Sequence, residues 1–149
     1  MRYTTPITDR TATDVTNKTS KAYFNIADWL RIYNNTQVTK DLVDFLLSTS
    51  VTFDTLSTPT TETIPTITEF NTLLSNIERI RLAAEPTVTG LAEIKDDWTA
   101  GPGSPSPDYL NANDWENVLD VIYNTIGVES GYTDWVEDSI TPVRRARAG

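Results

Sequence analysis

Apolar residues recur at helical spacing, three or four positions apart, in three separate stretches of the chain. The first stretch starts at Asn25 and runs to about Leu47, with a polar waist over residues 34–37. The waist leaves two interpretations open, namely one long helix or two helices with a break near Thr39. We favour the single helix, because helical spacing resumes after the waist. The apolar positions are Trp29, Ile32, Tyr33, Val38, Leu42, Phe45 and Leu46.

The other two stretches are more regular. The second covers about residues 67–84 and ends before Pro86, a common stop signal for helices. The third covers about residues 112–126, and Gly127 can end it in the left-handed conformation. The stripe of the second stretch consists of Phe70, Leu73, Leu74, Ile77 and Arg81, with Ile80 beside it. The stripe of the third consists of Trp115, Val118, Leu119, Ile122, Tyr123 and Ile126.

The connections between these stretches are long and rich in Thr, Ser, Pro and Gly. Residues 48–65 contain an alternating Val51-Thr52-Phe53, which permits a small hairpin or an irregular loop. In the second connection, residues 90–97 permit a short helix before the Gly/Pro run of residues 100–107, which excludes regular structure.

The first and third stretches begin with the same local signal. Tyr23 to Trp29 and Tyr109 to Trp115 share the order Tyr, apolar, Asn, two free positions, Asp, Trp. This order predicts an Asn N-cap, an Asp at N3 that completes a capping box, and a hydrophobic staple to the Trp. The expected caps are Asn25 and Asn111, the N3 acids are Asp28 and Asp114, and the staples join Phe24 to Trp29 and Leu110 to Trp115.

A looser copy of this signal opens the second stretch, with Thr66 as the cap, Glu69 at N3 and Phe70 at N4. The three expected caps stand about 41 and 45 residues apart, which is the spacing of a repeat. Good helix starts resemble one another, so the middle copy is explained equally well by this general similarity or by a true repeat. For the outer two copies we favour a repeat or a shared binding geometry.

These elements predict a mainly α fold, a small bundle of about three principal helices with extended terminal arms. We expect an N-terminal arm over residues 1–21, a helical core over residues 22–137 and an Arg-containing tail over residues 138–149. Both arms lack apolar periodicity, so we expect each to gain order against a partner.

Composition excludes several classes of function. The net charge of −9 argues against nucleic acid as the main partner, since phosphate binding needs clustered cations. The chain has no Cys and no His, so disulfides, thiolate metal sites and the commonest general base are absent. No apolar run reaches the length of a membrane span, and the first residues lack the apolar core of a signal peptide.

No motif for catalysis or cofactor binding is present, so we expect neither an enzyme nor a bound cofactor. The oxygen donors Asp108, Asn111, Asn113 and Asp114 lack the spacing of a calcium-binding loop, and capping already explains two of them. Trp29 and Trp115 are expected in the core. Trp98 and Trp135 lie in poorly periodic segments and are candidate contacts with another chain, as are Arg144, Arg145 and Arg147.

Two segments resemble a building block of tail-associated structural proteins of phages and prophages of Gram-positive bacteria. The first is Pro6-Ile7-Thr8-Asp9-Arg10-Thr11-Ala12-Thr13-Asp14-Val15, and the second runs from Ala22 to Asn35. Leu30 and Tyr33 replace the Asn and Glu usual in this pattern. The resemblance implies a virion component of the tail, baseplate or fibre-attachment region, and it implies no catalytic residue.

We therefore expect a structural protein of the virion that binds other virion proteins and copies of itself. The alternative is a small adhesin or carbohydrate-binding module that binds a host surface glycan through Trp98, Trp135 and Tyr132. A cell-wall glycan hydrolase is the third choice, because paired acids such as Asp41 and Asp44 are more readily explained as surface residues.

Overall fold

The computed structural model describes residues 2–22 and 24–128, and the described chain is all α. A short helix α1 (Ala12–Thr16) precedes the three principal helices α2 (Ile26–Leu47), α3 (Ile67–Ala84) and α4 (Tyr109–Ile122). A π-helical turn, η1 (Tyr123–Val128), extends α4. Helix α2 is continuous, which confirms the single helix. The described connections hold neither the possible strand over residues 51–53 nor the possible helix over residues 90–97.

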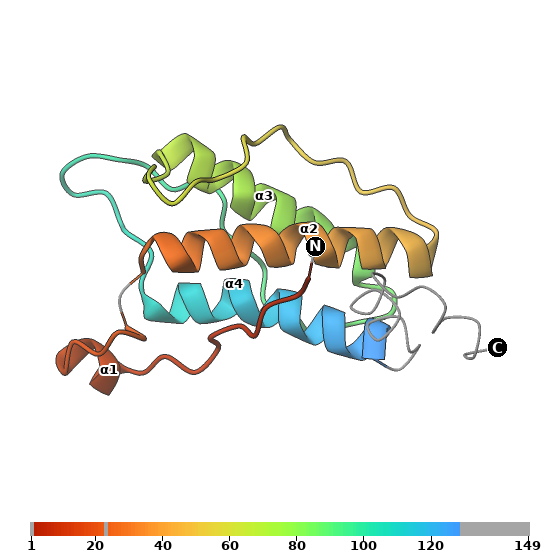
Figure 1. Ribbon diagram of the computed structural model, residues 1–149, viewed down its shortest axis with the longest axis horizontal. Coiled ribbons are helices and arrows are strands. Elements are labelled where there is room, and N and C mark those ends of the chain that lie inside the picture. Colours follow the sequence, from red (N-terminus) through yellow and green to blue (C-terminus); the bar gives the residue numbers. More distant parts are fainter. Residues whose placement is uncertain (1, 23, 129–149) are drawn as a thin grey trace.

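The three principal helices run parallel, with their first turns at the same end of the bundle (Figure 1). Helices joined by short loops pack antiparallel, because the chain must reverse at once. Here the connections over residues 48–66 and 85–108 are long enough to return along the whole bundle before the next helix starts. The extended connections are therefore what permits the parallel order.

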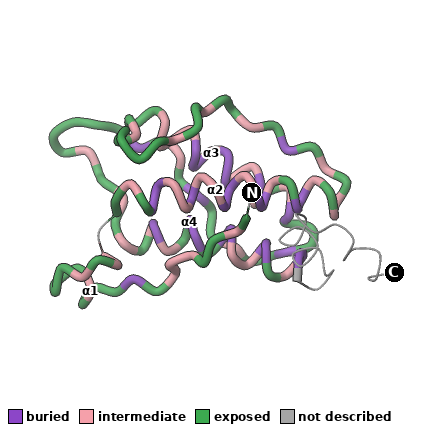
Figure 2. Tube along the Cα trace, in the orientation of Figure 1, coloured by how far each residue is buried: buried purple, intermediate pink, exposed green. Residues whose placement is uncertain are grey.

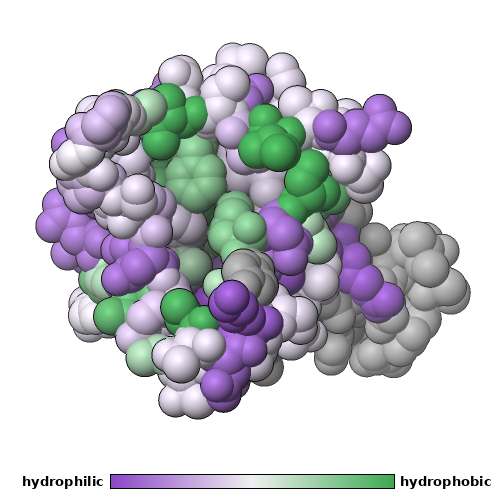
Figure 3. Space-filling view, turned by 90° about the vertical axis from the view of Figure 1, so that its left-hand side faces the viewer, coloured by the Kyte–Doolittle hydropathy of each residue, from purple (hydrophilic) through white to green (hydrophobic). Residues whose placement is uncertain are grey.

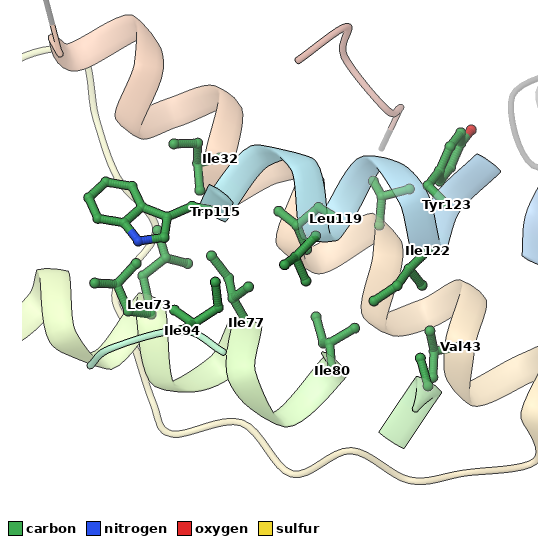
Figure 4. Packing of buried hydrophobic residues seen from close by; sticks show 14 of the residues in the cluster. Ile32, Val43, Leu73, Ile77, Ile80, Ile94, Trp115, Leu119, Ile122 and Tyr123 are labelled. Carbon is green, nitrogen blue, oxygen red and sulfur yellow. The ribbon is translucent and has the colours of Figure 1, made fainter. Parts of the chain in front are cut away.

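The core repeats in layers, one residue from each helix. Counted from each N-cap, the seventh, eleventh, fourteenth and eighteenth residues are all buried, an alternation of four and three as in a coiled coil (Figure 4). The layers are Ile32, Leu73 and Trp115; Thr36, Ile77 and Leu119; Thr39, Ile80 and Ile122; and Val43, Ala84 and Ile126. Figure 2 shows the same inward faces as buried segments along the helices.

Two of the three predicted caps are confirmed. The Asn25 side chain accepts hydrogen bonds from the N–H groups of Ala27 and Asp28, and the Asp28 carboxylate accepts from the Asn25 N–H in return. Thr66 and Glu69 form the equivalent capping box at α3.

The third cap was assigned wrongly to Asn111. The cap of α4 is Asp108, and Asn111 is its N3 residue, which accepts from the Asp108 N–H. The helix thus starts three residues earlier than predicted and passes into η1 after Ile122. Asp114 lies exposed in the second turn, and Leu110 is 54% exposed, so neither the predicted N3 acid nor the predicted staple exists. The true caps stand 41 and 42 residues apart, closer to a regular repeat than the sequence indicated.

The N-terminal arm packs against its own bundle, contrary to the expectation that it needs a partner. Arg10 is 3% exposed, and the Tyr3 ring stacks on Tyr123 with centroids 3.8 Å apart. Burial, with the nearby Asp120 carboxylate, raises the pKa of Tyr3. Residues 2–11 are extended, as predicted, and lie along α2 and α4, but the arm then forms the short helix α1.

Four asparagines on the helices hold the extended segments. Each side-chain amide accepts from the backbone N–H and donates to the backbone C=O of one extended residue, at 2.7–3.2 Å. We call these contacts asparagine pins. The pairs are Asn35 with Thr4, Asn76 with Asp54, Asn71 with Trp98, and Asn113 with Arg10. The pins replace the strand partner that an extended backbone otherwise needs.

Candidate functional site

A buried ion network joins the N-terminal arm to two helices. The Arg10 guanidinium lies 3.2 Å from the Asp28 carboxylate and 2.8 Å from that of Glu116. Arg31 contacts the same two acids at 2.5 and 2.6 Å. Two cations thus alternate with two anions, and the Arg31 side chain, 13% exposed, is the most accessible of the four.

This network serves to hold parts of the fold together. Both Glu116 oxygens are occupied, because Arg10, Arg31 and the Ile7 N–H all donate to them. Burial opposes the charge of Arg31, but hydrogen bonds to Glu116 and Asp28 outweigh it and raise the pKa of Arg31. These charges hold one another and the arm.

The more open feature is an apolar recess at the N-terminal end of the bundle, with a volume of about 450 Å³. We call it the end recess. Its lining comes from the arm, from the residues before α2, and from the first turns of α3 and α4. The apolar lining residues are Val15, Ala22, Phe24, Phe70, Pro107, Tyr109, Ala112 and Trp115. A neighbouring hollow of about 380 Å³ shares Phe24 and Phe70 with it.

The surroundings of the recess are unusually apolar for a surface. Figure 3 looks onto this end and shows hydrophobic side chains grouped around the hollow. Ile64 is 79% exposed and Val15 48% exposed, and both line these hollows. Single exposed apolar residues are normal, but a cluster of them around a concavity is typical of a protein–protein contact.

The end recess exists because one repeat departs from the other two. The fourth residue after the cap is Trp29 in α2 and Phe70 in α3, but Ala112 in α4. Trp115, from the next turn of α4, fills part of the space and contacts Phe70 edge to face, with centroids 5.1 Å apart. The remaining space lies beside the small Ala112 side chain.

One acid, Asp108, borders the end recess on the side of α4, and a second, Asp114, lies close to Asp108. Asp108 lines the recess, and its carboxylate accepts from two backbone N–H groups of the first helical turn. Partial burial, together with the negative charge of Asp108, raises the pKa of Asp114. Among the described residues, neither acid has an ion-pair partner. This border would therefore favour a cation from another chain.

The predicted interface residues fall in different places. Trp98 was wrongly assigned to a contact with another chain. It is 7% exposed, its backbone is held by Asn71, and Lys95 lies over its ring at 5.1 Å. The carbohydrate-binding alternative thereby loses one of its three aromatic side chains. Trp135, Arg144, Arg145 and Arg147 lie outside the described residues.

The predicted core residues Trp29 and Trp115 are both 3% exposed. The oxygen donors near α4 serve the fold: Asp108 and Asn111 form the capping box, and Asn113 pins Arg10. Within the described ranges, no cluster of three acidic residues has the arrangement of a metal site.

Sequence reasoning missed the residues that hold the arm. Glu116 was detectable, because it is a charged residue next to Trp115 in the apolar stripe of α4, and such a position needs a partner. Its partner Arg10 is far away in the sequence, and no local pattern connects the two.

None of the described helices is long and apolar enough to cross a bilayer. Comparison of the chain with protein-family models, with curated proteins and with solved structures gives no match in any of the three.

Proposed function

We propose that this chain is a structural component of a phage virion, in the tail, baseplate or fibre-attachment region, that acts by binding other virion proteins and copies of itself. The observation that carries the proposal is the end recess with its exposed apolar surroundings. Burial of such a surface against another protein removes apolar area from water, which is the main driving force of association.

The segments that resemble phage tail proteins make up one unit of the fold. Arg10, in the first segment, bonds Asp28 in the second, and Thr11 with Asp14 caps α1. The two segments are therefore parts of a single interlocked structure, which supports reading them as a shared building block.

The proposal places the protein in the virion. The net charge of −9 makes acidic surfaces repel nucleic acid, which favours protein partners over the packaged genome. Its work is then mechanical, to hold neighbouring subunits in a fixed arrangement.

Purified particles test this proposal directly. We expect quantitative mass spectrometry of gradient-purified virions to find the chain at a constant ratio to a major tail protein. Deletion of its gene should give particles that lack a tail substructure in electron micrographs. Its absence from particles whose other tail proteins are present would overturn the proposal.

A further inference from the structure

We propose that the end recess is a socket for Trp135 of a second copy of this chain, so that copies associate head to tail. The inference rests on the proposed assembly role and names one partner for it. Four features carry it: the missing aromatic in the third repeat, the acidic border, the composition of the segment after Val128, and the reach of that segment.

The socket lies where the third helix lacks a large side chain. The other two repeats place Trp29 and Phe70 at the position that Ala112 holds in the third repeat. An incoming aromatic ring would contact Phe24, Phe70 and Trp115, whose rings already meet edge to face. Aromatic side chains in well-packed pockets are the usual anchors of protein interfaces.

The charges of the two ends are complementary. Asp108 lines the socket, and neither it nor the nearby Asp114 has an ion-pair partner among the described residues. Partial burial, with the Asp108 charge, raises the pKa of Asp114. The segment with Trp135 also carries Arg144, Arg145 and Arg147. Arginine can bind a carboxylate through two parallel hydrogen bonds. A docked tail would therefore supply ion-pair partners to the acids near the socket.

The length of chain favours another copy over the chain's own socket. Helix α4 with η1 separates Ala112 from Val128 by up to about 24 Å, the length that all sixteen residues would have at the rise of an α-helix. The seven residues from Val128 to Trp135 span at most about 25 Å when fully extended. Almost no length remains for the chain to reverse direction after η1, so the socket of another copy is more accessible to Trp135 than its own.

The described chain ends at the opposite end of the bundle from the socket (Figure 1). A tail that leaves one end and a socket at the other make a heterologous contact, which continues from copy to copy until a rotation closes it. Such a contact gives a series of stacked copies, whose mean size rises with concentration.

The first test fills the socket from within. Ala112→Phe supplies the aromatic that the other repeats have, so it should leave the melting temperature at or above that of the unmodified chain. In sedimentation velocity of the full chain, it should weaken self-association about tenfold or more, and Trp135→Ala should do the same. Asn117→Phe, at an exposed position of the same helix, and Leu82→Ala, which removes an apolar side chain that is 51% exposed on α3, should leave association unchanged.

The second test does not depend on how Ala112→Phe folds. A photoreactive benzoylphenylalanine at Val15, an exposed wall of the socket, is irradiated in a mixture of ¹⁴N- and ¹⁵N-labelled full chains. We expect cross-links to residues 129–149 that join chains of different isotope. Cross-links within one chain only, or a chain that stays monomeric at all concentrations, would overturn the proposal. Neither result affects whether the chain is found in virions, so the proposed function stands or falls separately.

Discussion

At the scale of single residues, asparagine and aspartate perform two different tasks in this chain. At helix starts they satisfy the N–H groups that no earlier turn can reach. At the fifth and tenth positions after a cap, asparagine instead pins an extended segment, as Asn71 and Asn113 do at the fifth and Asn35 and Asn76 at the tenth. Both tasks use the same chemistry, a short polar side chain that matches a backbone amide.

The assignment of the α4 cap leads to a prediction. Asp108→Ala should lower the free energy of unfolding by about 1 kcal/mol, because it removes the acceptor for two N–H groups of the first turn. Urea denaturation of the full chain measures this loss. Asp108→Asn is the matched control, since asparagine caps equally well, and it should change stability little. Equal effects of the two variants would show that the capping hydrogen bonds are unimportant.

At the scale of elements, the arm is as much a part of the core as the helices are. Its extended backbone has no strand partner among the described residues, and it is held by two pins, by a ring stacked on Tyr123, and by the buried Arg10. The ion network sets its register, because Arg10 must meet Asp28 and Glu116 at once. A shift of the arm by one residue would leave these charges buried and unpaired, at a cost of several kcal/mol.

Removal of the central acid should therefore release the arm. Glu116→Ala leaves Arg10 and Arg31 buried with half of their partners, and it should cost about 3–5 kcal/mol. In limited proteolysis, residues 1–21 should resist cleavage in the unmodified chain and become sensitive in this variant. Asp54→Ala, which breaks a largely exposed pair with Arg79, serves as the control and should cost less than about 1 kcal/mol. An arm that is cut equally fast in all three chains would contradict this account.

The sequence was sufficient for the elements and insufficient for their arrangement. Local signals located α2 and α3 with their caps, because capping and amphipathic spacing act within a few residues. The start of α4 was ambiguous: Asp108 with Asn111, and Asn111 with Asp114, both have the spacing of a capping box. The structure adopts the first alternative, and Ala112 then lies buried in the helix. The pins, the ion network and the parallel order join distant residues, which no single-chain pattern reveals.

At the scale of the whole molecule, the described chain contains three units of the same kind. Each unit is an extended segment followed by a capped helix, and the caps are 41 and 42 residues apart. The helices contribute one residue each to every core layer, and the extended segments return along them (Figure 1). The departures from this repetition, above all Ala112, are therefore the places where function is expected.

The pins also predict where the chain tolerates change. Insertion of four Gly/Ser residues between Pro102 and Gly103, in an exposed turn, should lower stability by well under 1 kcal/mol, because loop closure depends weakly on length. The same insertion between Asp96 and Asp97 separates the pinned Trp98 from Ile94, which is buried and bonded to Glu78. That variant should melt well below the first. Thermal denaturation of both variants measures the difference, and equal melting temperatures would exclude a fixed register for this segment.

The parallel repetition has a consequence for the order of the chain itself. Three equivalent units around one axis form a cycle, and a cycle has no first member. A gene in which the unit of α3 comes first, followed by those of α4 and α2, encodes the same core layers and the same pins. Residues 129–149, joined to the former amino terminus, would supply the new connection. Circular permutants opened within residues 57–63 should therefore fold to the native bundle.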